Sequence, residues 1–186
     1  MKSIRYFLAL MIMLFFAFVN LYSQNIEQSS KIPVDGVTGL ITYQDVVQTE
    51  GNKQELFNRA VGWVNQFYVN PTEATKVRSP ESGIIEIVHR FKITNEVEGG
   101  VQADAGTILY SLKIELRDGR FRYSMDNFVL RQASRFPVER WLDKSDQAYN
   151  QNWDNYLSQV DVFAISLVES LKTAMQPEVI LKEEEW

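Results

Sequence analysis

The segment from Thr107 to Leu130 constrains the fold more than any other part of the sequence. Over Thr107–Arg117, apolar residues alternate with mostly polar ones, the period of a strand with one covered face. Asp118-Gly119 follows, and this dipeptide predicts a two-residue hairpin turn of type I′. A second strand returns over Arg120–Leu130, and its alternation changes phase near Asp126-Asn127, which predicts a β-bulge. An antiparallel hairpin is therefore the centre of the fold.

The flanking sequence predicts more strands and two helices. Asn52 and Glu55 have the spacing of a capping box, so a helix begins there, and it ends before Asn70-Pro71. A longer amphipathic helix precedes Pro177. The expected elements besides the hairpin are strands at 39–48, 75–79 and 84–93, helices at 52–69 and 150–175, an acidic loop at 95–106 and a connector at 132–144.

The order β-α-β-β-β-β-α predicts an α+β fold. A sheet with one apolar face must cover that face, and two amphipathic helices of this length can do so. We predict a two-layer sandwich, a five-stranded antiparallel sheet with two helices on one face. It forms a single domain at 38–176, with a flexible leader at 24–37 and a tail at 177–186. The aromatic residues expected in its core are Trp63, Phe67, Tyr110 and Phe163.

The N-terminus has the pattern of a secretory signal peptide over residues 1–23. Lys2 and Arg5 precede an uncharged apolar run at Tyr6–Val19, and Ser23 supplies a small side chain before a cleavage site. The run is shorter than the roughly 20 residues that a membrane-spanning helix needs. We therefore favour cleavage after Ser23 over an uncleaved membrane anchor, and we expect a periplasmic or extracellular protein.

The absence of cysteine excludes several classes of site. No lipid can be attached at a cleavage-site cysteine, and neither disulfides nor cysteine-ligated zinc sites can form. Removal of residues 1–23 changes the formal net charge from −5 to −7, which argues against general nucleic-acid binding. Phosphate-binding glycine motifs are also missing from the sequence, so no cofactor is expected.

Part of the first helix carries a pattern found in a known family. Over Lys53–Val64 it reads Glu-Leu-aromatic, then Arg-Ala, then Trp, and a glycine leads a later strand. The residues are Glu55, Leu56, Phe57, Arg59, Ala60, Trp63 and Gly83. With them, the chain resembles a family of exported bacterial domains of unknown function with a TATA-box-binding-protein-like (TBP-like) fold, over about residues 40–130. The resemblance implies that fold and supplies no catalytic residues. It does not imply DNA binding, because function belongs to sites rather than folds. Glu86 and Val88 depart from the small or glycine-containing segment expected after Gly83.

Basic side chains gather on the sheet face that the helices leave open. The candidates for binding an anionic ligand, a glycan or a partner chain are Arg90, Lys92, Lys113, Arg117, Arg120 and Arg122. Glu86 and Glu115 are interspersed among them. The competing interpretation, which we favour on sequence alone, is ordinary cross-strand ion pairing on a solvated face.

Catalytic and metal-binding patterns are sparse. His89 is the only histidine, and we interpret it as a structural imidazole on the covered face rather than a general base. The acidic segment from Asn95 to Asp104 does not match a calcium loop, so no metal site is predicted. Paired carboxylates, for example Asp126 with Asp45, could act as the acid and base of a hydrolase.

Together these features favour an exported, non-enzymatic binding or interaction module of the cell envelope. An envelope protein or a glycan is its expected partner; neither nucleic acid nor stable membrane insertion after signal cleavage is expected. The alternative is a small hydrolase that acts on an envelope polymer through paired carboxylates, such as Asp126 with Asp45.

Overall fold

The computed structural model describes residues 32–97, 100–132 and 134–177. The predicted signal peptide, most of the leader and most of the tail lie outside the described residues. The strands are β1 at Tyr43–Gln48, β2 at Thr75–Ser79, β3 at Ile84–Val97, β4 at Val101–Arg117, β5 at Arg120–Arg131 and β6 at Arg135–Pro137. The helices are α2 at Lys53–Phe67, α3 at Pro71–Ala74, the 3₁₀ helix η1 at Val138–Leu142 and α4 at Asn152–Ala174.

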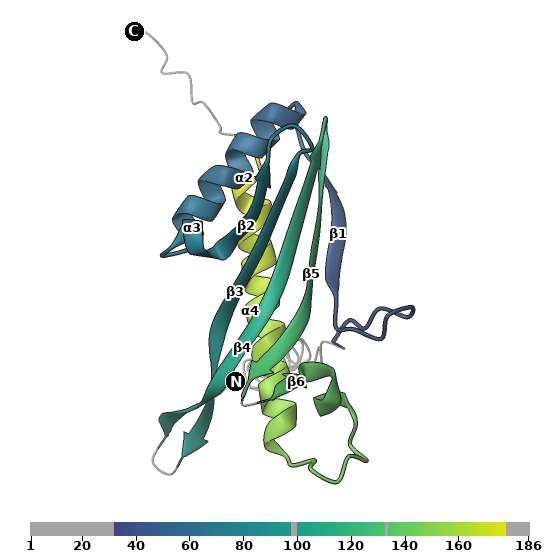
Figure 1. Cartoon of the computed structure of the whole chain (residues 1–186), viewed down its shortest axis with the longest axis vertical. Coiled ribbons are helices and arrows are strands. Elements are labelled where there is room, and N and C mark those ends of the chain that lie inside the picture. Colours follow the sequence, from purple (N-terminus) through teal and green to yellow (C-terminus); the bar gives the residue numbers. More distant parts are fainter. Residues whose placement is uncertain (1–31, 98–99, 133, 178–186) are drawn as a thin grey trace, which may run out of the picture. The chain divides into compact units, whose positions relative to one another are not determined.

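These strands form one antiparallel sheet in the order β1-β5-β4-β3-β2 (Figure 1). The sixth strand, β6, pairs with β5 at Val129–Arg131, beyond the stretch that pairs with β1. The predicted antiparallel sheet is confirmed, but it gains β6 from the segment expected to be a connector. Pro137 concealed this strand, since proline donates no ladder hydrogen bond and occurs in sheets mainly at edges.

The helices α2 and α4 lie together on one side of the sheet, as Figure 1 shows. At the start of α2, Asn52 Oδ1 accepts a hydrogen bond from Glu55 N at 3.0 Å, and Glu55 Oε2 accepts one from Asn52 N at 2.9 Å. The predicted capping box is therefore present. The buried side chains of the two helices include Leu56, Ala60, Trp63, Val64, Val160, Ala164, Leu167 and Leu171. The two-layer α+β sandwich is thus confirmed.

The central hairpin of β4 and β5 shows the predicted bulge and a different turn. Tyr110 faces two residues of β5, Asn127 and Phe128, and Asn127 has a positive φ of 56°. At the turn, Gly119 has a φ of 72°, whereas Asp118 is not among the residues with positive φ. Type I′ requires positive φ at both positions, so the prediction of that turn type is wrong.

The prediction of a loop at 95–106 is also wrong, because β3 and β4 continue as a paired hairpin to Val97 and Val101. The side chain of Gln159 on α4 binds both backbone groups of Thr94, with N···O distances of 2.9 and 2.8 Å. Ladder hydrogen bonds use backbone groups, so exposed hairpin arms need no apolar face. The acidic composition of this segment therefore concealed two strand ends.

The aromatic core is close to the predicted one. Trp63 and Tyr110 are buried, and Phe163 stacks on Phe91 with ring centroids 3.9 Å apart. Phe67 is the exception, since it is 37 % exposed and covers Trp63 from the solvent side at a centroid distance of 5.1 Å. Within the described ranges, no helix combines the length and apolarity needed to cross a membrane.

Candidate functional site

The basic candidates lie on the sheet face opposite the helices, and strand register decides which of them are neighbours. Arg117 on β4 faces Arg120 on β5, next to the turn. In the next row on the same face, Arg122 lies between Glu115 on β4 and Val46 on β1. Facing residues on neighbouring strands have Cβ atoms about 5 Å apart. Three guanidinium groups therefore share one end of the sheet.

The turn between β4 and β5 is fixed to the start of α2. Asp118 Oδ1 accepts a hydrogen bond from Lys53 N at 2.7 Å, where the first N–H groups of a helix lack intrahelical acceptors. Gly119 N donates to Gly51 O at 2.9 Å, and Gly119 O accepts from Thr49 N at 3.1 Å. These three hydrogen bonds give the arginines beside the turn a well-anchored base.

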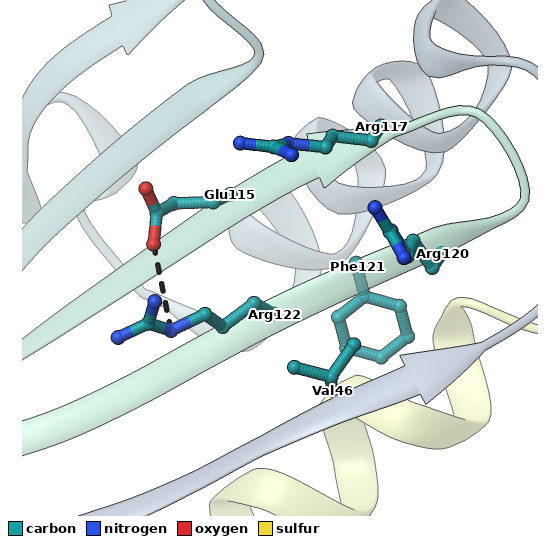
Figure 2. A pocket seen from close by; sticks show the side chains of 6 residues that line it. All are labelled: Val46, Glu115, Arg117, Arg120, Phe121 and Arg122. Carbon is teal, nitrogen blue, oxygen red and sulfur yellow. Dashed lines mark ion pairs between the residues drawn. The ribbon is translucent and has the colours of Figure 1, made fainter.

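An open hollow of about 230 Å³ lies among these side chains (Figure 2). Its lining comprises Val46, Glu115, Arg117, Arg120, Phe121 and Arg122; we call it the arginine hollow. Val46 is 51 % exposed and supplies apolar surface, while Phe121 is fully buried beneath it. Small-molecule sites usually measure about 300–1,000 Å³. The arginine hollow therefore suits one or two carboxylate-sized groups.

The charges around the arginine hollow are not balanced. Glu115 lies 3.7 Å from Arg122 Nε and 3.6 Å from Lys113 Nζ, so one carboxylate serves two cations. Among the described residues, neither Arg117 nor Arg120 has an ion-pair partner within 4.0 Å. Two like charges in facing positions on neighbouring strands destabilise a sheet. This end of the sheet consequently presents uncompensated positive charge.

The remaining basic candidates do not join this cluster. Arg90 pairs with Glu73 at 3.5 Å, and Lys92 pairs with Asp104 at 2.9 Å. Lys113 Nζ lies between two glutamates, 3.9 and 3.6 Å from their carboxylate oxygens. For these three residues, the interpretation as solvated ion pairing agrees with the geometry.

A second hollow of about 330 Å³ lies at the bulge end of the same face, and the sequence-based candidates did not include it. Val88, Leu109 and Val129 supply apolar surface to it. At its rim, Asn127 Oδ1 accepts a hydrogen bond from the guanidinium of Arg135. The predicted bulge was the available signal, since bulges often occur beside functional sites.

The carboxylate pair proposed for hydrolysis is not brought together. Asp45 faces Tyr123, whose buried side chain points towards the helices. Asp126 faces Ser111 on the opposite side of the sheet. Burial raises the pKa of Asp126, an effect opposed by the hydrogen bond from Ser124. Tyr123 and Asp126 are three residues apart on β5, so their side chains point to opposite faces of the sheet. Asp45, which faces Tyr123, therefore lies on the other face from Asp126, and the prediction that the two form a catalytic pair is wrong.

His89 lies against two tyrosines. Its ring is edge-on to Tyr68 at a centroid distance of 5.0 Å, and the hydroxyls of Tyr68 and Tyr110 are hydrogen-bonded at 3.1 Å. Burial, and then the charge of Arg90, lower the pKa of His89, while burial raises the pKa of Tyr110 to about 12. A neutral imidazole packed on aromatic rings fits the structural interpretation. In the part of the chain that the structure describes, no group of three or more potential ligands could hold a metal ion.

Comparison with known proteins identifies the domain that carries the arginine hollow. Residues 43–131, which contain every residue lining the hollow, match the family described as "Domain of unknown function (DUF4468) with TBP-like fold". Residues 43–131 are a DUF4468 domain. The resemblance noted in the first helix is thus confirmed for both the family and its fold. No curated protein matches the chain.

Two solved structures share the fold of this DUF4468 domain. A TBP-like protein from Parabacteroides distasonis superposes with a TM-score of 0.62 at 15% identity, covering 77% of this chain and 96% of its own. A DUF4468 family protein from Bacteroides ovatus gives a TM-score of 0.61 at 13% identity, covering 81% of this chain and 94% of its own. At such identities the likeness establishes the fold alone, so any function must be argued from the site.

Proposed function

We propose that this DUF4468 domain is an exported, non-enzymatic binding module that holds a carboxylate-bearing ligand in the arginine hollow. The observation that carries the proposal is the pair Arg117 and Arg120, which face one another in register and have no carboxylate partner among the described residues. A guanidinium presents a planar fork of donors that matches a carboxylate, so a bound anion would offset the repulsion between the two arginines.

The dimensions and charges support binding rather than catalysis. The arginine hollow is about 230 Å³, and its single carboxylate, Glu115, is committed to Arg122 and Lys113. A general base must instead be free to reach a proton on the substrate. The anchored turn favours a preformed site, because fewer groups have to be ordered when the ligand binds.

The location outside the cytoplasm is part of the same proposal, and it rests on the first 23 residues. Two basic residues, a 14-residue apolar run and Ser23 make the pattern of a cleaved signal peptide. Intact-mass analysis of the protein from its native host should give a chain that begins at Gln24 or a neighbouring residue. A mass that includes residues 1–23 would contradict cleavage.

Binding is tested with two probes that share carboxylate chemistry but come from different sources, labelled hexaglutamate and labelled oligogalacturonate. The variant Arg117→Gln/Arg120→Gln should bind the preferred probe at least about tenfold more weakly than the wild type, because charge-assisted hydrogen bonds are worth roughly 1.5–3 kcal/mol each. The matched control is Arg90→Gln/Lys92→Gln, which also removes two cations from the same face but from existing ion pairs.

Each outcome of this comparison is informative. Weak binding by Arg117→Gln/Arg120→Gln together with normal binding by Arg90→Gln/Lys92→Gln would support the proposal. The probe that binds more tightly then shows whether the ligand is a peptide or a glycan. Equal losses in the two variants would indicate diffuse electrostatics rather than a site. If the wild type binds neither probe at low salt, the proposed function is wrong.

A further inference from the structure

The C-terminal end of α4 lies beside the turn that carries the arginine hollow. Met175 O accepts hydrogen bonds from Thr49 Oγ1 at 3.0 Å and from Arg59 Nη1 at 3.1 Å. The backbone N–H of Thr49 donates to Gly119 O at 3.1 Å. Figure 1 shows the yellow end of α4 at the same end of the sheet as the β4–β5 turn. The chain therefore leaves α4 close to the two unpaired arginines.

The sequence that follows α4 is complementary in charge to the hollow. Pro177 cannot continue a helix in the usual way, since it has no N–H to donate. Residues 178–186, which lie outside the described residues, read EVILKEEEW. They place three consecutive carboxylates at Glu183–Glu185, next to Trp186. This is the most concentrated run of negative charge in the printed sequence.

The length of the segment is sufficient to reach the hollow. Glu184 is eight residues after Gln176, and an extended chain spans about 3.3 Å per residue, or roughly 26 Å in total. The segment has to pass only around the end of one sheet, and a sheet layer is about 10 Å thick. The extended segment is therefore more than twice as long as one sheet layer is thick.

We propose that Glu183–Glu185 occupy the arginine hollow of their own chain, pair with Arg117 and Arg120, and compete there with the external ligand. This inference rests on the proposed function, because it assigns an internal occupant to the same site. A short tether gives an effective concentration in the millimolar range, so even weak carboxylate–guanidinium contacts are populated. Since the contacts are electrostatic and exposed, salt should weaken them.

The test compares the purified wild type with the variant Glu183→Gln/Glu184→Gln/Glu185→Gln. An effective concentration of a few millimolar, set against a dissociation constant of about 1 mM for the internal contact, predicts about fivefold tighter binding of labelled hexaglutamate by this variant. A matched control, Glu50→Gln/Glu81→Gln, removes negative charge from exposed positions outside the segment and should change the affinity by less than twofold.

A direct readout does not depend on the probe. The indole N–H of Trp186 is expected to shift in NMR spectra between the wild type and Arg117→Gln/Arg120→Gln, whereas Trp63, Trp141 and Trp153 are buried elsewhere and should not shift. The wild-type position should not depend on protein concentration. A concentration-dependent shift would mean that the segment binds a second copy, which would overturn the intramolecular assignment.

The two proposals can fail separately. If the triple glutamine variant binds hexaglutamate no better than the wild type and Trp186 is insensitive to the arginines, the internal occupant is wrong, while loss of probe binding in Arg117→Gln/Arg120→Gln still supports the site. If Trp186 responds but no external probe binds, the internal contact stands and the proposed function fails.

Discussion

Gly83 is the residue at which a single methyl group should disturb this fold most clearly. It lies just before β3 with a φ of +68°, and its carbonyl accepts a hydrogen bond from Leu116 N at 2.8 Å. A Cβ atom added to Gly83 would lie 2.5 Å from the backbone oxygen of Leu116. That oxygen belongs to the central strand β4, so it cannot move aside as a flexible side chain would. Gly83→Ala therefore forces the β2–β3 turn away from β4.

The expected loss has two contributions. The left-handed φ costs a residue with a Cβ atom about 1–2 kcal/mol, and a steric clash that shifts packed backbone costs about 1–3 kcal/mol more. Gly119→Ala is the matched control, because Gly119 has a φ of +72° but nothing within 4 Å of its Cβ position. We expect a loss of about 2–5 kcal/mol for Gly83→Ala and about 1–2 kcal/mol for Gly119→Ala.

Urea denaturation followed by circular dichroism measures both losses as changes in the free energy of unfolding. The difference between the two variants isolates the contact with Leu116, because both share the backbone strain. Gly83→Asn adds a third point, since asparagine tolerates positive φ but still carries a Cβ atom. Equal losses for Gly83→Ala and Gly119→Ala would refute the steric argument.

Two further predictions concern the core and pH. Trp63→Ala should lower the free energy of unfolding by about 3–5 kcal/mol, because Trp63 is 4 % exposed and donates a hydrogen bond from Nε1 to Ser170 Oγ at 3.0 Å. A melting temperature within a degree or two of the wild type would show that the packing of Trp63 is unimportant. The pKa of His89 is lowered in the folded state. At a pH just below about 6.5, the ordinary pKa of histidine, the unfolded chain therefore binds more protons than the folded chain, and stability should fall as the pH is lowered through this range. Because the chain has one histidine, His89→Gln should remove this part of the pH dependence in denaturation curves, and an unchanged profile would contradict the assignment.

Much of the architecture could be predicted because its signals are local. The alternation along β4 and β5, the capping box at Asn52 and the phase change at Asp126-Asn127 all depend on neighbours within a few residues, and the structure contains each of them. The errors occur where the deciding contact is distant. Asp118 does not have the positive φ of a type I′ turn. Its carboxylate accepts a hydrogen bond from Lys53 N at the start of α2, 65 residues away in the sequence.

For the candidate site, the sequence determined which face the basic residues occupy, because side chains on a strand alternate strictly between two faces. It could not determine which of them remain unpaired. That depends on register: Arg90, Lys92 and Lys113 lie near carboxylates, whereas the hairpin places Arg117 opposite Arg120. The sequence also could not show that Asp45 and Asp126 lie on opposite faces, because that depends on how β1 pairs with β5. Composition and periodicity are properties of the chain, but charge neutralisation acts through space, so only the tertiary structure decided where positive charge remains.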